Sequence, residues 1–385
     1  MSLWNELNAA GRAVAVAILS SGVLLVIIVA LNLIPVSRVS YVSDLAAATA
    51  SAISQNAIPA KHVATPAAVK GIYMTACVAS GRNIRDKILE TIAGTEINSI
   101  VIDVKDYTGT ISYSDTEVLG PKGRGCRITD LPEFLAELHA KGIYAIGRVT
   151  VFQDPLYALY KPDMAVQSMS ELGRPWKDKS GLSYIDPDST PYWQYIAAIA
   201  KEAHTIGFDE INFDYIRFPS DGDMSDVQFA LPVDATKASV ITSFFKYLSS
   251  ELQPLGITTS ADLFGQTTVN RDDMGIGQIL ENALPYFDYV SPMDYPSHYV
   301  DGFLGYDKPA LKPYEIVNET MMSAVERTVT ASSSVSKLRP WLQAFDLGAV
   351  YTPEMVQAQI QAIYHSGVNG WMLWDAGNRY TKAEL

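Results

Sequence analysis

After residue 69, short apolar runs rich in β-branched and aromatic residues alternate with longer segments whose apolar positions recur every three or four residues. Each short run is followed by a polar loop, an amphipathic segment and a glycine, and then by the next run. Eight such runs occur, at residues 71–76, 99–105, 143–151, 208–215, 257–262, 286–294, 339–345 and 370–374. Eight strands alternating with helices predict an α/β fold, a (β/α)8 TIM barrel closed by parallel strands.

Helix boundary signals support this pattern. The run Asp130-Leu131-Pro132-Glu133 predicts a helix start with a capping box, and Gly142 predicts the end of that helix. Thr190 and Thr352 each precede a proline, which is typical of a first helical turn. Only ten residues follow Asp375, so we expect the eighth helix to be short or absent.

One long apolar segment lies outside the repeating pattern. Residues 13–34 contain no charged side chain, and 22 residues are enough to cross the ~30 Å hydrocarbon layer of a membrane as a helix. The small residues at 46–50 also offer a signal peptidase site, so a retained anchor and a cleaved signal both stay open. We expect one N-terminal transmembrane helix as a signal anchor at 1–36, a linker at 37–68 and the barrel at 69–385.

The charges that flank the apolar segment and the short stretch before it indicate on which side of the membrane the barrel lies. Arg12 precedes the apolar segment and Arg38 follows it, so the positive-inside signal is nearly balanced. The short stretch before the segment favours the N-terminus staying inside. We therefore expect a membrane-anchored protein whose barrel lies outside the cytoplasm, at the cell surface or in the periplasm.

The amino-acid composition limits the classes of binding partner that the protein can have. The 42 acidic residues outnumber the 29 basic ones and give a net charge of −13, which disfavours nucleic acid as a partner. Neutral carbohydrate meets no such penalty. The two cysteines, Cys77 and Cys126, are too few for a disulfide scaffold or a thiolate zinc site. A single bridge and two buried thiols both remain open.

Carboxylates gather where the predicted strands end: Asp103, Asp214, Asp262, Asp294, Asp346 and Asp375. The carboxyl ends of barrel strands meet at one mouth, where the active sites of this fold lie. Crowded carboxylates differ in pKa, as acid/base pairs require. A structural charge network is the competing interpretation. Because side chains alternate along a strand, Asp103 should share a face with Lys105, and Asn212 with Asp214.

Other chemistries are disfavoured. His139, His204 and His365 each lie just before a glycine that ends a predicted helix, where they complement the helix C-terminus rather than bind a metal. The sixth strand carries no lysine for a Schiff base, and no Gly-x-Ser-x-Gly motif occurs. We therefore expect neither a metal nor a cofactor.

The longest loop, 152–189, is rich in aromatic residues: Tyr157, Tyr160, Trp176 and Tyr184. It follows the third strand and so lies at the mouth of the predicted barrel. Its aromatic rings could stack on sugars or could form a small core for the loop itself. Both interpretations stay open.

Five segments carry a family resemblance: 208–219, 260–265, 291–299, 339–343 and 370–374. In this order, and over about residues 70–380, they resemble a family of bacterial glycoside-hydrolase barrels whose activity is largely unassigned. The resemblance implies a barrel that acts on a polysaccharide or a cell-wall glycan, without fixing the sugar.

A second likeness is informative where it fails. Residues 209–216 resemble the chitinase-type Asp-x-x-Asp-x-Asp-x-Glu strand, but Asn212 replaces an aspartate and Ile216 replaces the catalytic glutamate. Hydrolysis of N-acetyl sugars by the substrate-assisted route should therefore be absent. Asp214 remains, as in retaining barrels with a nucleophile on the fourth strand.

These observations define the expected active site of a glycoside hydrolase, and we expect its partner to be a carbohydrate substrate. We expect Asp214 to be the nucleophile or charge stabiliser and Asp262 the acid/base, with Asp294 as the rival of Asp262. Further side chains are expected to bind substrate or to neutralise charge: Asp103, Lys105, Arg148, Trp176, Arg217, Tyr295, Gln343, Trp374 and Asp375. Barrel-core packing is the alternative for Trp374. The competing function is a non-catalytic glycan-binding or cell-envelope scaffold protein on a barrel fold.

The anchor interpretation makes a direct prediction. If residues 13–34 are retained, the full-length protein sediments with membranes, and protease added from outside digests the barrel. Cell fractionation and protease protection measure both. A soluble protein with its N-terminus near Ala52 would instead mean that the segment is cleaved.

Overall fold

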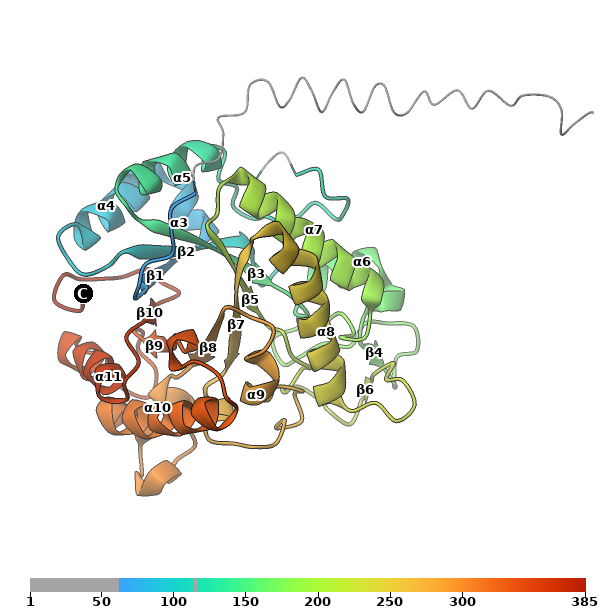
Figure 1. Cartoon of the computed structure of the whole chain (residues 1–385). Coiled ribbons are helices and arrows are strands. Elements are labelled where there is room, and N and C mark those ends of the chain that lie inside the picture. Colours follow the sequence, from blue (N-terminus) through green and yellow to red (C-terminus); the bar gives the residue numbers. More distant parts are fainter. Residues whose placement is uncertain (1–61, 114–115) are drawn as a thin grey trace, which may run out of the picture. The chain divides into compact units, whose positions relative to one another are not determined.

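The structure, a computed structural model, describes residues 62–113 and 116–385. Its centre is a closed barrel of eight parallel strands in the order β1-β10-β9-β8-β7-β5-β3-β2 (Figure 1). The strands are β1 (Lys70–Met74), β2 (Ser99–Lys105), β3 (Tyr144–Thr150), β5 (Glu210–Asp214), β7 (Thr258–Phe264), β8 (Tyr289–Met293), β9 (Trp341–Gln343) and β10 (Trp371–Trp374). Each overlaps the apolar run that predicted it, so the predicted TIM barrel is confirmed.

Helices alternate with the strands around the barrel (Figure 1). They are α3 (Ala76–Ser80), α4 (Arg82–Ile92), α5 (Leu131–Ala140), α6 (Pro155–Tyr160), α7 (Thr190–Ile206), α8 (Lys237–Leu252), α9 (Leu280–Ala283), α10 (Pro313–Thr330) and α11 (Pro353–His365). Outside the barrel, β4 (Gln167–Ser168) pairs antiparallel with β6 (Val227–Gln228). Within the described part of the chain no helix follows β10, as expected from the short C-terminal segment.

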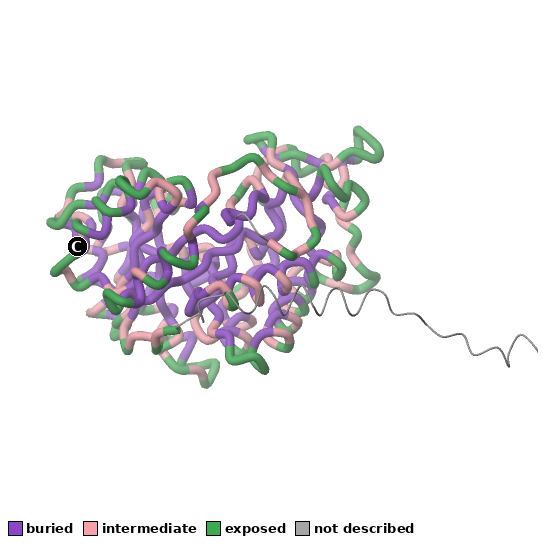
Figure 2. The backbone as a smooth tube through the Cα atoms, turned by 90° about the horizontal axis from the view of Figure 1, so that it is seen from above, coloured by how far each residue is buried: buried purple, intermediate pink, exposed green. Residues whose placement is uncertain are grey.

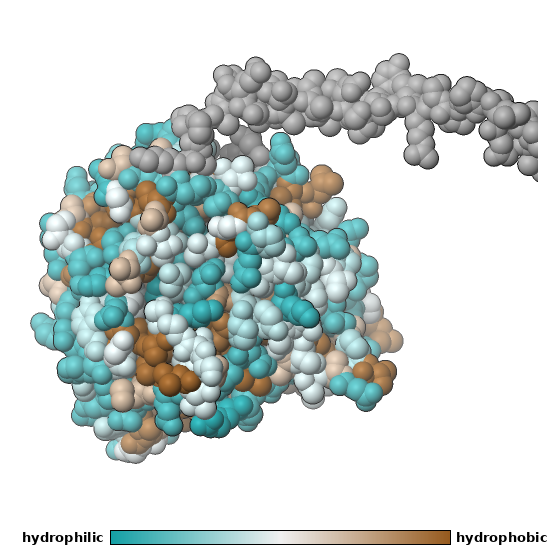
Figure 3. Space-filling view, in the orientation of Figure 1, coloured by the Kyte–Doolittle hydropathy of each residue, from teal (hydrophilic) through white to brown (hydrophobic). Residues whose placement is uncertain are grey.

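Burial explains why the apolar runs become barrel strands. Every residue of β2, β3 and β5 is buried, because these strands pack against side chains on both faces. Figure 2 shows the buried residues concentrated in the barrel and the exposed ones in the loops around it. On the face in Figure 3, hydrophobic side chains form small groups between hydrophilic ones.

The start of α5 differs from the sequence prediction. Asp130 precedes the helix, but its side chain makes no capping hydrogen bond. Its two carboxylate oxygens instead accept hydrogen bonds from the buried Arg85 guanidinium of α4, at 3.0 and 2.7 Å. The predicted capping box is therefore wrong, because a tertiary ion pair takes the carboxylate away from the helix end.

A β-bulge at the end of β2 changes which side chains face the barrel interior. Asp103 pairs with Arg148 but Lys105 pairs with Val149, so one extra residue is inserted. The Lys105 ammonium consequently lies 2.8 Å from Asp154 Oδ2, while Asp103 bonds to Arg148. The expectation that Asp103 and Lys105 share a face is wrong, because the bulge breaks the alternation.

The N-terminal predictions are not reached by the structure. The expected anchor at 1–36 and most of the linker at 37–68 lie outside the described residues. Among residues 62–113 and 116–385, no helix has the length and apolar character needed to cross a bilayer.

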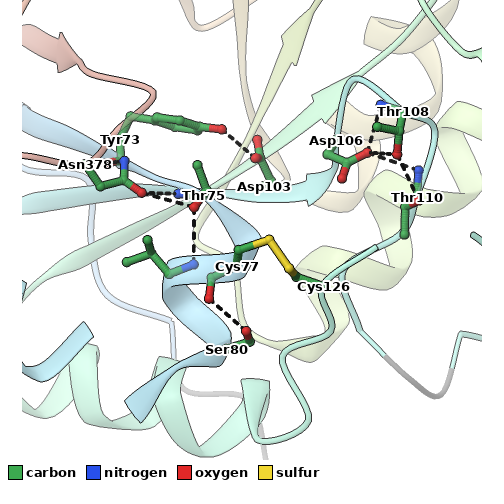
Figure 4. The surroundings of a disulfide bond; sticks show 11 residues. Tyr73, Thr75, Cys77, Ser80, Asp103, Asp106, Thr108, Thr110, Cys126 and Asn378 are labelled. Carbon is green, nitrogen blue, oxygen red and sulfur yellow. Dashed lines mark hydrogen bonds between the residues drawn. A yellow bond between two sulfur atoms is a disulfide. The ribbon is translucent and has the colours of Figure 1, made fainter. Parts of the chain in front are cut away.

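Cys77 and Cys126 form a disulfide, which decides between the two possibilities left open by the sequence. The bond joins α3 to the loop that precedes α5, with Cα atoms 4.9 Å apart (Figure 4). Two residues before Cys77, Thr75 donates to Asn378 in the C-terminal segment (Figure 4). The disulfide therefore fixes a loop at the rim of the barrel close to where the C-terminal segment packs.

Replacing both cysteines by serine should lower the free energy of unfolding. A separation of 49 residues corresponds to about 4 kcal/mol of loop-closure entropy in the unfolded chain. Urea unfolding of the full-length protein measures the loss, and adding a thiol reductant to the wild type should reproduce it. The double variant is the control, since reductant should leave it unchanged. Equal stability of the wild type with and without reductant would contradict this prediction.

Candidate active site

A cavity of about 490 Å³ lies at the carboxyl ends of the barrel strands. Six of the twelve predicted site residues line it: Arg148, Asp214, Arg217, Asp262, Tyr295 and Trp374. They come from β3, β5, β7 and β10 and from the loops after β5 and β8. The position at the barrel mouth is the one that the fold uses for active sites.

Arg148 of β3 joins two carboxylates in the barrel interior. Its Nε and Nη2 donate to Asp214 Oδ2 at 3.1 and 2.5 Å, and its Nη1 donates to Asp103 Oδ1 at 2.7 Å. The Trp374 ring lies 4.9 Å from the guanidinium carbon, and Tyr73 donates its hydroxyl to Asp103 Oδ2 (Figure 4). Asp103 does not line the cavity. The guanidinium thus balances the negative charge of Asp214 and fixes its orientation.

The backbone after Asp214 is strained. Tyr215, the next residue, has a φ of 53°, a left-handed conformation that is rare for an aromatic residue. Its N–H donates to Asp214 Oδ1 at 2.5 Å, and its side chain lines the cavity. The turn therefore holds Asp214 from the backbone side while Arg148 holds it from the other.

Asp262 of β7 lies in a different environment. Its Oδ1 accepts hydrogen bonds from Asn212 Nδ2 and Trp341 Nε1, both at 2.8 Å. Burial raises the pKa of Asp262 well above its ordinary value, and the negative charge of Asp214 raises it further. In the part of the chain that the structure describes, no group donates to Asp262 Oδ2. This arrangement favours a proton on Oδ2, because Oδ1 already accepts two N–H groups.

Asp294, the rival acid, lies elsewhere. Burial raises the pKa of Asp294 to about 7. Its oxygens, however, accept hydrogen bonds from Tyr299 at 2.7 Å and from Thr320 of α10 at 2.6 Å, and it does not line the cavity. Burial therefore raises this pKa despite the two hydrogen bonds, which lower it, and these bonds occupy the Asp294 oxygens at a contact between the barrel and α10. Of the two rival acids, only Asp262 lines the cavity.

The other predicted site residues have structural partners. Asp375 accepts the N–H groups of Gly377 and Arg379 in the turn after β10. The Gln343 side chain bonds to the backbone of Ser297. Lys105 forms the buried ion pair with Asp154. None of these lines the cavity.

Trp176 also lies away from the cavity. Its ring is buried, and Nε1 donates to the Asp223 carbonyl at 3.0 Å. Tyr157 and Tyr184 of the same long loop are buried too, whereas Tyr160 is exposed. Of the two open interpretations of this loop, the structure favours a small core of its own.

Several side chains at the site were not predicted from the sequence, among them those of Trp341, Tyr215 and Tyr73. Trp341 donates to Asp262, Tyr215 lines the cavity, and Tyr73 stacks on Trp374 with ring centroids 3.9 Å apart. The sequence held two signals for Trp341: it lies in the segment 339–343 that carries the family resemblance, and it alternates with Gln343 on one strand. No group of His, Cys, Asp or Glu suited to a metal occurs among the described residues.

The fold and the carboxylates at its mouth define a barrel of the kind found among glycoside hydrolases. The chain belongs to the family described as "Putative glycosyl hydrolase domain", whose sequence model matches residues 71–380. The expected family and enzyme class are thereby confirmed. No curated protein sequence matches the chain.

Solved structures of two glycoside hydrolases share the fold. The glycoside hydrolase domain of PgaB (BpsB) from Bordetella bronchiseptica has a TM-score of 0.58 at 14% identity, over 81% of this chain and 95% of that one. Alpha-L-fucosidase isoenzyme 2 from Paenibacillus thiaminolyticus has a TM-score of 0.57 at 13% identity, over 82% of this chain and 48% of that one. A hypothetical protein from Ruminiclostridium thermocellum is 32% identical, over 50% of this chain and 96% of that one, with a TM-score of 0.44.

The environment of Asp262 predicts a pH-dependent stability. The pKa of Asp262 in the folded protein lies above the value of about 3.9 that an aspartate has in an unfolded chain. The contribution of this carboxyl to the free energy of unfolding is therefore complete below about pH 3.9 and is lost as the pH rises through the folded-state pKa. Asp262→Asn removes this loss. The difference in melting temperature, variant minus wild type, should therefore grow from pH 5 to pH 8.

Circular dichroism melting curves at each pH measure this difference. Asp301→Asn, at an exposed acid, is the matched control and should give a difference that changes little with pH. A constant difference for Asp262→Asn would mean that the buried carboxyl is no more easily protonated in the folded protein than in the unfolded chain.

Proposed function

We propose that the chain is a retaining glycoside hydrolase that cleaves a polysaccharide or cell-envelope glycan through Asp214 and Asp262. One observation carries the proposal: two carboxyl groups line the same cavity in opposite electrostatic environments. Asp214 is paired with Arg148, whereas burial and the charge of Asp214 raise the pKa of Asp262. Hydrolysis of a glycosidic bond needs one carboxylate and one carboxylic acid.

The two groups have complementary tasks. Asp262 donates the proton on Oδ2 to the glycosidic oxygen as the bond to the leaving sugar breaks. Asp214 attacks the anomeric carbon and forms a glycosyl ester. Asp262, now a carboxylate, takes a proton from a water molecule, which hydrolyses the ester and restores both groups.

Strand register supports retention over inversion. Asn212 pairs with Ser260 and Phe213 with Ala261, so the same register brings Asp214 beside Asp262 on the neighbouring strand. Neighbouring strands lie ~4.8 Å apart, close to the ~5–5.5 Å between the carboxyl groups of retaining enzymes.

Aromatic side chains suit the cavity to sugars. Tyr295 and Trp374 line it, and the Trp374 ring stacks on Tyr73 and lies perpendicular to the ring of Trp341. Rings fixed in this way can pack against the apolar faces of pyranose rings without losing much conformational entropy.

We further propose that the protein is anchored in a membrane by residues 1–36, followed by a linker at 37–68, with the domain at 69–385 outside the cytoplasm. The apolar segment at 13–34 is the sequence basis for the anchor. The Cys77–Cys126 disulfide adds support for the location, because disulfides persist mainly in oxidising compartments.

The catalytic assignment predicts a specific pattern of losses. Asp214→Asn and Asp262→Asn should each lower kcat by roughly a thousandfold or more, since each removes a group that acts on the reacting atoms. Asp262→Asn should lose most on substrates with poor leaving groups. Asp294→Asn is the matched control, a buried acid outside the cavity, and should retain most of its kcat. A polysaccharide panel assayed for reducing ends measures this.

Stereochemistry tests the same assignment independently. An NMR time course on the best substrate should give the product with its anomeric configuration retained. Inverted product, or full activity in Asp214→Asn, would overturn the mechanism. Glycan binding without turnover, with affinity unchanged in Asp214→Asn, would favour the scaffold function instead.

A further inference from the structure

One buried arginine at the cavity lacks the partner that all comparable arginines have. Five arginines are buried in the described part of the chain. Four of them form ion pairs, namely Arg85 with Asp130, Arg148 with Asp103 and Asp214, Arg327 with Glu281, and Arg339 with Glu210. Arg217 is 7% exposed, yet no carboxylate of the described residues lies within 4.0 Å of it. A buried charge without a counterion is costly, which makes Arg217 an exception that needs an explanation.

The contacts of Arg217 leave one edge of the guanidinium free. Its Nη1 donates to the Phe218 carbonyl at 3.0 Å and to Ser220 Oγ at 3.2 Å. Its Nη2 makes one long contact of 3.5 Å with the Tyr184 hydroxyl, and its Nε donates to no described group. The two nitrogens of the Nε–Nη2 edge therefore retain N–H groups for a ligand.

Aromatic rings hold the guanidinium in place. The guanidinium carbon lies 4.6 Å from the centroid of the Phe264 ring and 5.3 Å from that of Tyr215. Both rings line the cavity together with Arg217. Stacking of this kind favours a cation and fixes its plane, so the free edge is preorganised rather than mobile.

Arg217 lies in the same cavity as the proposed catalytic groups. It follows Asp214 by three residues and lines the same cavity as Asp214 and Asp262. Arg148, the other arginine of the cavity, already donates to two carboxylates. Arg217 is therefore the cation of the cavity that can bind a negative group on a ligand.

We propose that Arg217 binds the carboxylate of an acidic sugar, so that the substrate is a glycan containing uronic-acid-type residues. The proposal rests on the proposed function for the glycan nature of the substrate. A carboxylate is planar and carries one charge on two oxygens, which matches the two N–H groups on one guanidinium edge. At a net charge of −13 the chain repels anions at long range, so a local cation is needed to bind one.

Binding measurements test the proposal apart from catalysis. The ligands are oligosaccharides of galacturonate, glucuronan and alginate, each paired with its carboxyl-reduced, neutral counterpart, and sulfated oligosaccharides form a separate arm. The full-length protein carries Asp262→Asn to prevent turnover, and calorimetry gives the affinities. At least one acidic oligosaccharide should bind roughly tenfold or more tightly than its neutral counterpart. No preference for the acid in any pair, or binding of sulfated ligands alone, overturns the proposal.

Variants assign the preference to Arg217. Arg217→Gln should weaken binding of the acidic ligand far more than that of its neutral counterpart and so remove the preference for the acid. Arg217→Lys should keep part of the preference, because a lysine has charge but no planar fork. Arg174→Gln, at an exposed arginine that does not line the cavity, is the matched control. Equal weakening of acidic and neutral ligands would mean that Arg217 only supports the aromatic rings. If Arg217→Gln melts much lower than wild type, Arg217→Lys decides by the same comparison.

The outcomes separate this proposal from the proposed hydrolase. If acidic oligosaccharides bind tightly but wild-type protein never cleaves them, the role of Arg217 is supported and the proposed hydrolase function is contradicted. If the protein cleaves neutral glycans and binds acidic and neutral oligosaccharides equally well, the role of Arg217 is contradicted and the proposed hydrolase function is supported.

Discussion

The site depends on the bridge that Arg148 makes between Asp103 and Asp214 inside the barrel. Three charged groups are removed from water there, and such a cluster persists only if its members satisfy one another. The bridge ties β2, β3 and β5 together and turns Asp214 towards the cavity. It also leaves Asp262 without a cation of its own within ion-pair distance, so burial and the charge of Asp214 act on that carboxyl and favour its protonated form. The different states of the two acids follow from this one arrangement.

A single strand organises the polar interior. Glu210, Asn212 and Asp214 alternate along β5 and face inward, one above the other. Glu210 pairs with Arg339, Asn212 donates to Asp262, and Asp214 binds Arg148. Ser260 links the first two levels, since it donates to Glu210 and accepts from Asn212. Polar groups in the barrel interior are thus connected from the base to the mouth, which restricts the orientation of the acid that faces the cavity.

Two acids of similar burial illustrate why a raised pKa alone does not identify an active site. Asp262 and Asp294 both lie near the ends of neighbouring strands, and burial raises the pKa of both. Only Asp262 lines the cavity, while the oxygens of Asp294 are occupied by Tyr299 and Thr320. An acid must reach its substrate before its pKa matters. The same reasoning applies to the buried arginines. Arg217 lines the cavity and has N–H groups free for a ligand, whereas the other four buried arginines of the described residues already form ion pairs with carboxylates.

The sequence by itself determined the barrel and the inward face of β5, because strand and helix periods are local properties of the chain. It therefore placed Asn212 and Asp214 on one face correctly, and it located Arg148, Asp262 and Trp374 at the cavity. Only the tertiary structure decided the partners. The bulge that separates Asp103 from Lys105, the hydrogen bond from Trp341 to Asp262 across 79 residues, and the missing counterion of Arg217 all arise between distant segments. A local pattern fixes which way a side chain points, but the group that it meets depends on how the strands close into a barrel.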